Sequence, residues 1–381
     1  MKKLFAIIKK SLAVIGIALI SLTLLEVTVR VYLNFYPLAE IEVQREDLFI
    51  PLHPYFGHHD ESPIMPERVE RKSDSEYIVL LLGGSTALSI PWKLQKHLNQ
   101  ANPFPEISRF RVIFAAHHGF QTVQDKNHLV AFLSNGSEID LVVCVEGFNN
   151  LVRPLENYAY QLPLNYPGWY WVAANQMEYG SPEDYHLALF LDGLKNRQSL
   201  RRLKSLQLGL TGLVKVLVKH FHNRGLEAIE EKITNLSTEE KFLVWEKALE
   251  IYRNDILFMD KVARCRGIDI IFVLHAMLGY DRENPTQFEE QFLRDSPMYD
   301  LQLMPYSAWI QGYDMLRASG EELKGSGVDY IDFSSVFSSV KLNPYLDMVH
   351  MNEEGSDIFG EKLANEILLR IGRNKTGHNG D

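Results

Sequence analysis

Cysteine is almost absent from this chain, which has only Cys144 and Cys265 among its 381 residues. Two cysteines are too few for a disulfide scaffold or for a metal site made of cysteines. We therefore expect both to be buried thiols. A single disulfide between them is the alternative.

The chain also lacks an excess of basic charge. It has 39 Lys and Arg residues against 49 Asp and Glu residues, for a net charge of −10. A protein that binds nucleic acid needs a basic surface to neutralise the phosphates. The composition therefore disfavours a nucleic-acid partner.

The common cofactor-binding motifs are missing as well. There is no Walker A loop, no GxGxxG and no GxSxG, which disfavours nucleotide binding and the nucleophile turn of α/β-hydrolases. His53, His58 and His59 stand near Asp60, but no further ligand follows at the spacing of a metal site, so we expect a solvated loop there. The sequence predicts neither a cofactor nor a metal.

Charge is missing from one long stretch near the N-terminus. Residues 11–25 carry no charged side chain and follow lysines at positions 2, 3, 9 and 10. Continued to Leu33, the apolar stretch reaches the roughly 20 residues that cross a bilayer. We predict a cytoplasmic tip and a single transmembrane helix at residues 1–36, with the rest of the chain periplasmic or extracellular. A cleaved signal peptide is the alternative, although no small-x-small cleavage pattern follows the stretch.

Five short apolar runs predict the strands of the main domain. Hydrophobic residues make up 46% of the chain and charged residues 23%, which suffices for a buried core. Runs that are apolar at nearly every residue suit a parallel sheet covered by helices on both faces. The sequence thus predicts an α/β fold with strands at residues 77–82, 112–116, 141–145, 270–274 and 328–331.

Helix signals stand between and after these strands. The clearest predicts a helix over Thr238–Cys265, because Ser237 and Glu240 form a capping box before it and Gly267 follows it. Another helix is expected at about residues 353–371. The main domain accordingly spans residues 76–372, between a linker or loop at 37–75 and a flexible tail at 373–381.

One insertion interrupts the main domain. Residues 151–236 are too many for an ordinary crossover connection and predict a largely helical insertion. Within it, residues 193–224 hold eight Lys or Arg residues and no acid. This composition suits a membrane-facing or lid element. The alternative is a helix pair with a solvated basic face.

Residues with a catalytic pattern follow the first and the last predicted strand. Ser85 stands in Gly-Gly-Ser-Thr directly after the first strand, at the edge where open α/β sheets present groups to a ligand. A serine hydroxyl needs a base before it attacks. Asp347 and His350 come after the fifth strand, and an Asp three residues before a His can orient the ring and stabilise the imidazolium. We predict Ser85 as nucleophile, His350 as base and Asp347 as its partner.

Hydrogen-bond donors for an oxyanion are expected on two further loops. Gly119 follows the second strand and can bring a backbone N–H close, and Asn149 follows the third and offers a side-chain amide. The backbone N–H of Ser85 is a third donor. Of the nearby histidines, His117 and His118 are expected to line the pocket, and the histidine at position 275 to be a pocket or core residue.

Ser85, Gly119, Asn149 and Asp347-x-x-His350 occur in the order that gives the SGNH hydrolase superfamily its name. Over residues 77–150 and 269–370 the chain resembles this family of GDSL-like lipases and esterases, in its membrane-anchored bacterial type. The resemblance implies a three-layer, flavodoxin-like α/β/α sandwich with strand order 2-1-3-4-5. It also implies that Gly119 and Asn149 belong to the oxyanion hole and that the other three residues form the triad.

The chain departs from the family pattern at two positions. The nucleophile block reads Gly-Gly-Ser, with Gly84 in place of the Asp in the usual Gly-Asp-Ser. Asn150 stands where the family often has an Asp after the residue equivalent to Asn149. Gly-Gly-Ser-Thr variants look similar to membrane-anchored proteins associated with bacterial surface polysaccharides. The departures therefore bear on the substrate more than on the chemistry.

The expected function is that of a serine esterase acting on an O-acyl group of a cell-envelope glycan. A lysophospholipase or thioesterase acting on lipid is one alternative, and an O-acyltransferase with the same catalytic residues is another. A non-catalytic glycan-binding or assembly protein could keep the same fold. Turnover of a chromogenic acetyl ester separates the enzymes from the binding protein.

Overall fold

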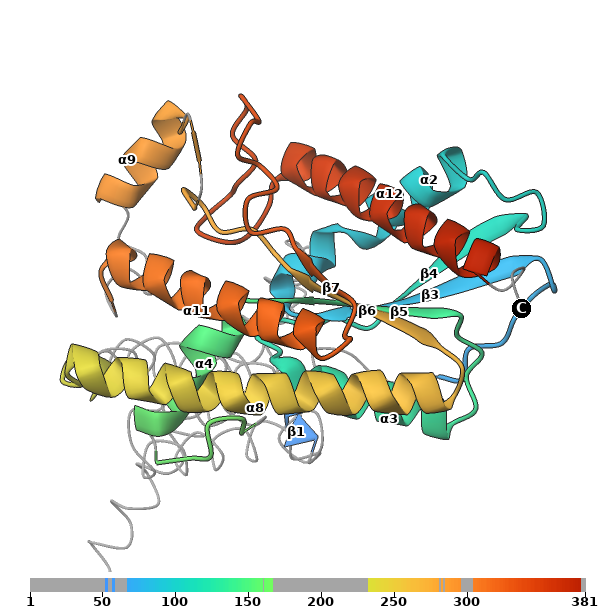
Figure 1. Cartoon of the computed structure of the whole chain (residues 1–381). Helices are drawn as coiled ribbons and strands as arrows, with labels where there is room; N and C mark the ends of the chain where they lie inside the picture. The colour runs from blue at the N-terminus through green and yellow to red at the C-terminus, as the bar shows by residue number, and fades with distance from the viewer. Residues whose placement is uncertain are drawn as a thin grey trace, which may run out of the picture. The chain divides into compact units, whose positions relative to one another are not determined.

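A five-stranded parallel sheet forms the core of this computed structural model (Figure 1). The structure describes residues 52–53, 57–58, 67–159, 161–166, 232–280, 282–283, 285–295 and 304–377. Numbered along the chain, the strands lie in the order 2-1-3-4-5, which confirms the expected α/β fold and strand order. These strands are β3 (Glu76–Gly83), β4 (Arg109–Phe114), β5 (Leu141–Glu146), β6 (Asp269–Leu274) and β7 (Tyr330–Asp332).

The edge strands depart most from the sequence expectation. The central strand β5 is buried at every residue, as a run apolar throughout predicts. In contrast β4 has one neighbour only and begins at the exposed Arg109, ahead of the predicted start at Val112. An edge strand tolerates charge, and here Arg111 pairs with Glu76 at 3.3 Å. The apolar-run criterion therefore missed the beginning of β4, and β7 likewise starts later than residue 328.

Helices cover both faces of the sheet (Figure 1). On one face α2 (Pro91–Gln100) packs against α12 (Glu353–Gly377). The other face carries α3 (Thr122–Ser134), α4 (Asn149–Ala159), α8 (Thr238–Cys265) and α11 (Tyr306–Gly325). The result is the three-layer arrangement that the resemblance implies. The remaining described elements are the 3₁₀ helix η1 (Ser85–Ser89), α9 (Gln287–Asp295) and a short antiparallel pair, β1 (Leu52–His53) and β2 (Gly57–His58).

Helix α8 has the predicted bounds and the predicted cap. The Ser237 hydroxyl accepts the Glu240 N–H at 3.1 Å, and the Glu240 carboxylate accepts the Ser237 N–H at 2.8 Å. These reciprocal bonds satisfy donors that a helix start leaves unpaired. The buried Trp245 donates from its ring nitrogen to the Leu151 carbonyl at 2.9 Å. This bond fastens α8 to α4, the helix that begins at Asn149.

The two cysteines differ in exposure. Both are free thiols, and Cys144 is buried in β5. Cys265 is exposed, so the expectation of two buried thiols was wrong for this residue. The reason is its place as the last residue of α8, at the start of a surface turn that continues through Gly267.

The stretch just before β3, which the sequence assigns to a linker, makes contacts with the domain. The backbone N–H of Val69 donates to the Ser137 hydroxyl at 3.0 Å. The guanidinium of Arg71 donates to the Asp140 carboxylate at 2.6 Å. At the other end, α12 continues to Gly377, past residue 371 where the sequence predicts its end.

Some sequence predictions fall outside the described residues. These are the anchor at residues 1–36, most of the linker before residue 67 with His59 and Asp60 of the expected solvated loop, residues 167–231 of the insertion with its basic stretch at 193–224, and the end of the tail. Among the described residues, no helix combines the length and apolarity needed to cross a membrane.

Candidate active site

A tight glycine turn presents Ser85 at the carboxyl end of β3. Gly83 has a φ of +146°, and a Cβ at this position would lie 2.4 Å from the Val145 carbonyl oxygen. Glycine is therefore required both by conformation and by space. Ser85 then begins a short 3₁₀ helix, Ser85–Ser89. Because the first N–H groups of a helix have no acceptor within it, the backbone N–H of Ser85 is available to a ligand.

A chain of hydrogen bonds joins the three predicted triad residues. The Ser85 Oγ lies 2.7 Å from His350 Nε2, and His350 Nδ1 lies 2.6 Å from Asp347 Oδ2. An ionised carboxylate only accepts, so Nδ1 carries the proton and Nε2 is left to accept from the serine hydroxyl. The arrangement has the geometry needed to deprotonate Ser85 during attack on a carbonyl carbon.

Asp347 is held as a carboxylate. Its burial favours the neutral form, but hydrogen bonds from the His350 ring, the His350 N–H and the Val349 N–H outweigh it and keep the pKa of Asp347 below its ordinary value. The two backbone bonds measure 2.8 and 2.9 Å and meet Oδ1, which leaves Oδ2 for the ring. A negative charge at this point stabilises the imidazolium that forms when His350 takes a proton.

The loop that carries Asp347 and His350 is braced against the sheet. Leu346 donates its N–H to the His350 carbonyl at 2.8 Å, and Tyr345 forms a bridge with Met351. A further bond of 2.8 Å runs from the Leu278 N–H, after β6, to a carbonyl of this loop. The backbone thus fixes the distance between the histidine and the nucleophile turn.

The Asn149 amide lies beside the nucleophile turn. Its Nδ2 donates to the Phe120 carbonyl at 2.9 Å, which joins the loop after β4 to the start of α4. A Cβ on Gly84 would lie 2.4 Å from this same Nδ2. A side chain at position 84 would therefore displace the amide, so this arrangement of Asn149 requires glycine there. Gly119, next to Phe120, has a φ of +71°, which favours glycine.

His275 is a buried positioning residue. Its Nε2 lies 3.1 Å from the Phe148 N–H, and Nδ1 lies 2.8 Å from the Ala276 carbonyl. Burial lowers the pKa of His275 to about 4, so the ring is neutral and can accept from Phe148 while it donates to Ala276. It supports the loop that leads to Asn149, in line with a core residue. Of His117 and His118, which the sequence places at the pocket, His117 is half-buried and His118 is exposed.

The predicted site residues come together at one edge of the sheet. Ser85 follows β3, Gly119 follows β4, Asn149 follows β5 and the Asp347–His350 loop follows β7. The strand order places these strand ends side by side, and the serine, histidine and aspartate are in hydrogen-bond contact. The chain has an SGNH-like hydrolase fold.

Comparisons with known proteins give distant structural likenesses. No family model and no curated protein sequence matches the chain. Solved structures that resemble it include the acetyl xylan esterase AlAXEase, with 12% identity and a TM-score of 0.35 over 76% of this chain and 99% of that one. A GDSL-like lipase from Bacteroides thetaiotaomicron has 10% identity and a TM-score of 0.35 over 78% and 89% of the two chains. An alpha/beta hydrolase enzyme from the metagenome of Lake Arreo, Spain, has 14% identity and a TM-score of 0.35 over 77% and 96%. Likeness at this level carries no argument about the reaction.

Some residues around the site escaped the sequence reasoning. A Cβ on Gly119 would lie 3.7 Å from the guanidinium of Arg153, which also binds the fully buried Glu156 at 2.8 Å. Arg153 lies one helical turn after Asn149 on α4, and this spacing is the sequence signal that could have placed it near the site. Glu146 was missed as well, although a lone acid at the end of an apolar strand is unusual.

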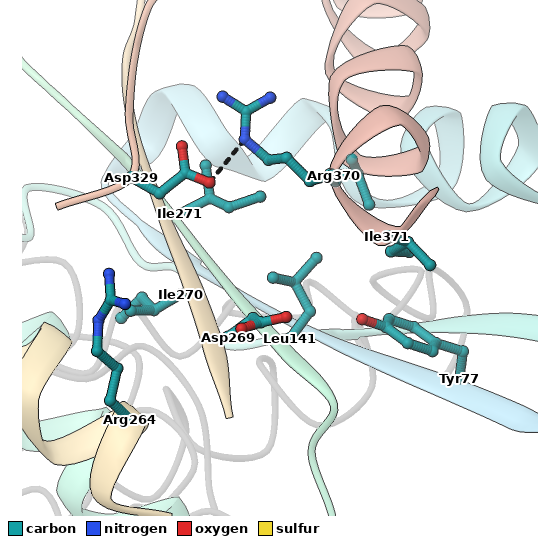
Figure 2. Close-up of a pocket in the computed structure, with 10 residues that line it drawn as sticks. Tyr77, Leu141, Arg264, Asp269, Ile270, Ile271, Asp329, Arg370 and Ile371 are labelled. Atoms are coloured by element: carbon teal, nitrogen blue, oxygen red, sulfur yellow. Dashed lines mark hydrogen bonds and ion pairs between the residues drawn. The ribbon is translucent and has the colours of Figure 1, made fainter. Parts of the chain in front are cut away.

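A separate hollow lies at the opposite edge of the sheet (Figure 2). It is lined by the first residues of two strands, Leu141 of β5 and Asp269 of β6. Arg370 there pairs with Asp329 at 2.7 Å. Because parallel strands begin at this edge and end at the other, the hollow is separate from the site of Ser85.

The contact between Gly84 and Asn149 predicts the effect of adding one methyl group. Gly84→Ala should displace the Asn149 amide and slow the labelling of Ser85 by a fluorophosphonate, by up to roughly 10² to 10³-fold as for a lost oxyanion donor. Gly325→Ala is the matched control, because a Cβ there meets no atom within 4 Å. Circular dichroism should show both variants folded. A Gly84→Ala variant that labels as fast as the control would contradict the contact.

Proposed function

We propose that the protein hydrolyses carboxylic esters through an acyl-Ser85 intermediate. The observation that carries the proposal is the unbroken hydrogen-bond chain from the Ser85 hydroxyl through the His350 ring to the Asp347 carboxylate, at 2.7 and 2.6 Å. Surface serines do not need such a chain, whereas a nucleophilic serine requires it.

The reaction follows from the positions of these groups. Ser85 Oγ attacks the ester carbonyl carbon while its proton passes to His350 Nε2. As the tetrahedral intermediate collapses, the bond to the alcohol oxygen breaks and His350 returns the proton to that oxygen. Water then attacks the acyl-serine with the same base, releases the carboxylic acid and restores the Ser85 hydroxyl.

The oxyanion of each tetrahedral intermediate needs donors aimed at it. The backbone N–H groups of Ser85 and Gly119 and the side-chain amide of Asn149 are proposed for this role. The amide uses one hydrogen to bind the Phe120 carbonyl, which orients the second hydrogen. Donors fixed in advance in this way contribute more than mobile ones, because they need no reorganisation during the reaction.

The triad predicts a graded response to substitution. Ser85→Ala should abolish both fluorophosphonate labelling and turnover of a chromogenic acetyl ester, and His350→Ala should nearly do so. Asp347→Asn should lose less than His350→Ala, because a base remains although its ring orientation and charge stabilisation suffer. Melting temperatures within a few degrees of the native protein are the control for folding. Full esterase activity in Ser85→Ala would rule out the triad.

An O-acyl group on a cell-envelope glycan is the substrate that we propose. Trp92 stands on the first turn of α2 and is 80% exposed. Three residues on, Gln95 accepts the N–H of Val112 at 2.9 Å, so this helix face lies along β4. Phe114, 43% exposed, ends that strand on the site's edge of the sheet. Exposed aromatic faces suit the stacking of sugar rings beside the ester.

A substitution of the tryptophan tests the glycan substrate. Trp92→Ala should raise KM for an acetylated oligosaccharide several-fold and leave kcat/KM for a small chromogenic acetyl ester unchanged. Leu369→Ala, at an exposed apolar position near the end of α12, is the control and should alter neither. An unchanged oligosaccharide KM would contradict the stacking role. Loss of vesicle binding in Trp92→Ala would instead favour the lipid-directed lysophospholipase or thioesterase.

Two other functions use the same fold. An O-acyltransferase would pass the acyl group from Ser85 to a sugar hydroxyl in place of water, and product analysis with an added acceptor separates it from a hydrolase. A non-catalytic glycan-binding or assembly protein would leave Ser85 unlabelled. The hydrogen-bond contact between Ser85 and His350 is our reason for preferring an enzyme.

We further propose that the N-terminal segment anchors the protein in the cytoplasmic membrane, with the hydrolase domain outside the cytoplasm. The support is the uncharged stretch at residues 11–25 behind four lysines. Alkaline phosphatase fused after Asp381 should be active, because it matures only where disulfides form. A fluorescent protein that folds only in the cytoplasm, fused at the same point, should stay dark. The reverse pair of results would place the domain in the cytoplasm.

A further inference from the structure

Two fully buried acids lie beneath the loops that carry Ser85 and Asn149. Asp125, on α3, accepts the N–H of Gly83 on its Oδ1 at 3.0 Å. Glu146, the last residue of β5, accepts the side-chain amide of Asn150 on its Oε2 at 2.6 Å. Asn150 in turn accepts from the N–H and the hydroxyl of Thr122 at 3.2 Å. One acid thus holds the nucleophile turn and the other holds the residue after Asn149.

Among the described residues, no donor is found for the second oxygen of either acid. Asp125 Oδ2 and Glu146 Oε1 are buried and find no hydrogen-bond partner among the donors of the described residues. The backbone brings the two acids close together, because Gly83, which Asp125 holds, is the register partner of Val145, the residue before Glu146. Two carboxylates are acceptors only, so a bond between them requires that one be protonated. A single proton between the two orphaned oxygens satisfies both.

We propose that Asp125 and Glu146 share one proton, and that this carboxyl–carboxylate bridge is a positioning device that ties the nucleophile turn to the loop of the Asn149 amide. In this arrangement Gly83 donates to one acid and Asn150 donates to the other, and the shared proton lies between the two acids. Both ends of it require an acceptor, because Gly83 and Asn150 donate. The middle therefore has room for one proton only.

The surroundings favour one proton at neutral pH. Burial, followed by repulsion from Asp125, raises the pKa of Glu146 well above its ordinary value, and burial raises that of Asp125. The pair titrates as a unit. Burial also raises the pKa of the facing Cys144, Tyr252 and Tyr330, so these groups are neutral.

One charged group faces the pair from α8. Asp255 repels Glu146 but forms its own ion pair with Lys126 of α3. Its burial raises the pKa of Asp255, and the Lys126 ammonium opposes that rise. Lys126 is thus the counterion of Asp255, and the proposed proton is shared between Asp125 and Glu146 alone.

Amide substitutions test the one-proton arrangement directly. In Glu146→Gln the new amide can donate to Asp125 Oδ2 and still accept from Asn150. In Asp125→Asn it can donate to Glu146 Oε1 and still accept from Gly83. Each single variant should therefore fold and keep its melting temperature at neutral pH. The double variant turns two donors toward each other, and its melting temperature should fall well below the sum of the single shifts. Additive shifts would overturn the proposal.

The proton also has a spectroscopic signature. The infrared C=O band of a buried, protonated carboxylic acid should be present in the native protein at neutral pH and should vanish in either single variant. Asp255→Asn is the matched control, because it removes a neighbouring buried acid that pairs with Lys126, and it should leave the band in place. A band that survives both single substitutions, or that disappears in Asp255→Asn, would contradict the shared proton.

The pH dependence has a definite sign. A group whose pKa is raised by folding stabilises the protein at low pH, and this contribution is lost as the pH rises through its folded pKa. The melting temperature of the native protein should therefore fall toward alkaline pH more steeply than that of Glu146→Gln, which has no proton to lose there. Parallel curves would overturn the proposal.

The positioning role alone rests on the proposed esterase function. It predicts that ester turnover of the native protein declines at alkaline pH before that of Glu146→Gln. The melting and infrared measurements need no substrate. A protein without esterase activity would thus refute the proposed function and leave the shared proton to be judged by these two measurements.

Discussion

The hydrogen bond between Ser85 and His350 is the interaction on which the site depends. It joins residues 265 positions apart in the chain, at 2.7 Å. Such a contact is possible because parallel strands all end at one edge of the sheet, so loops that follow the first and the last strand meet there. Backbone bonds hold the loop after β7 in place, including the one that it accepts from the Leu278 N–H after β6. They keep the histidine at the distance that proton transfer requires.

The edge is crowded, and glycines make the crowding possible. Gly83 leaves no room for a side chain against the Val145 carbonyl, and Gly84 leaves none against the Asn149 amide. Close approach of this kind lets side chains of three loops converge on the nucleophile turn, but it also leaves polar backbone groups buried. Asp125 satisfies one of them, the N–H of Gly83. The buried acids and the glycine turn are thus parts of one structure.

Much of the fold and of the site could be predicted from the sequence, because the signals were either local patterns or site residues in the same order as in a known family. The run before Gly83 is apolar throughout, the Ser237–Glu240 box marks the start of α8, and the spacing of Asp347 and His350 lets one orient the other. What the sequence could not supply depended on tertiary neighbours. The polar start of β4 is stabilised by Glu76 of another strand. The sequence also does not show that Asp125 of α3 lies beneath the same loops as Glu146.

The acyl-Ser85 intermediate is tested most directly by a mass spectrum of the peptide that contains Ser85, from protein that is quenched in acid while it turns over a chromogenic acetyl ester. We expect an acetyl group on Ser85 that forms within the first turnover, persists in the steady state and disappears once the ester is consumed. Continued turnover with Ser85 unmodified, or with the acetyl group on another residue, would contradict it.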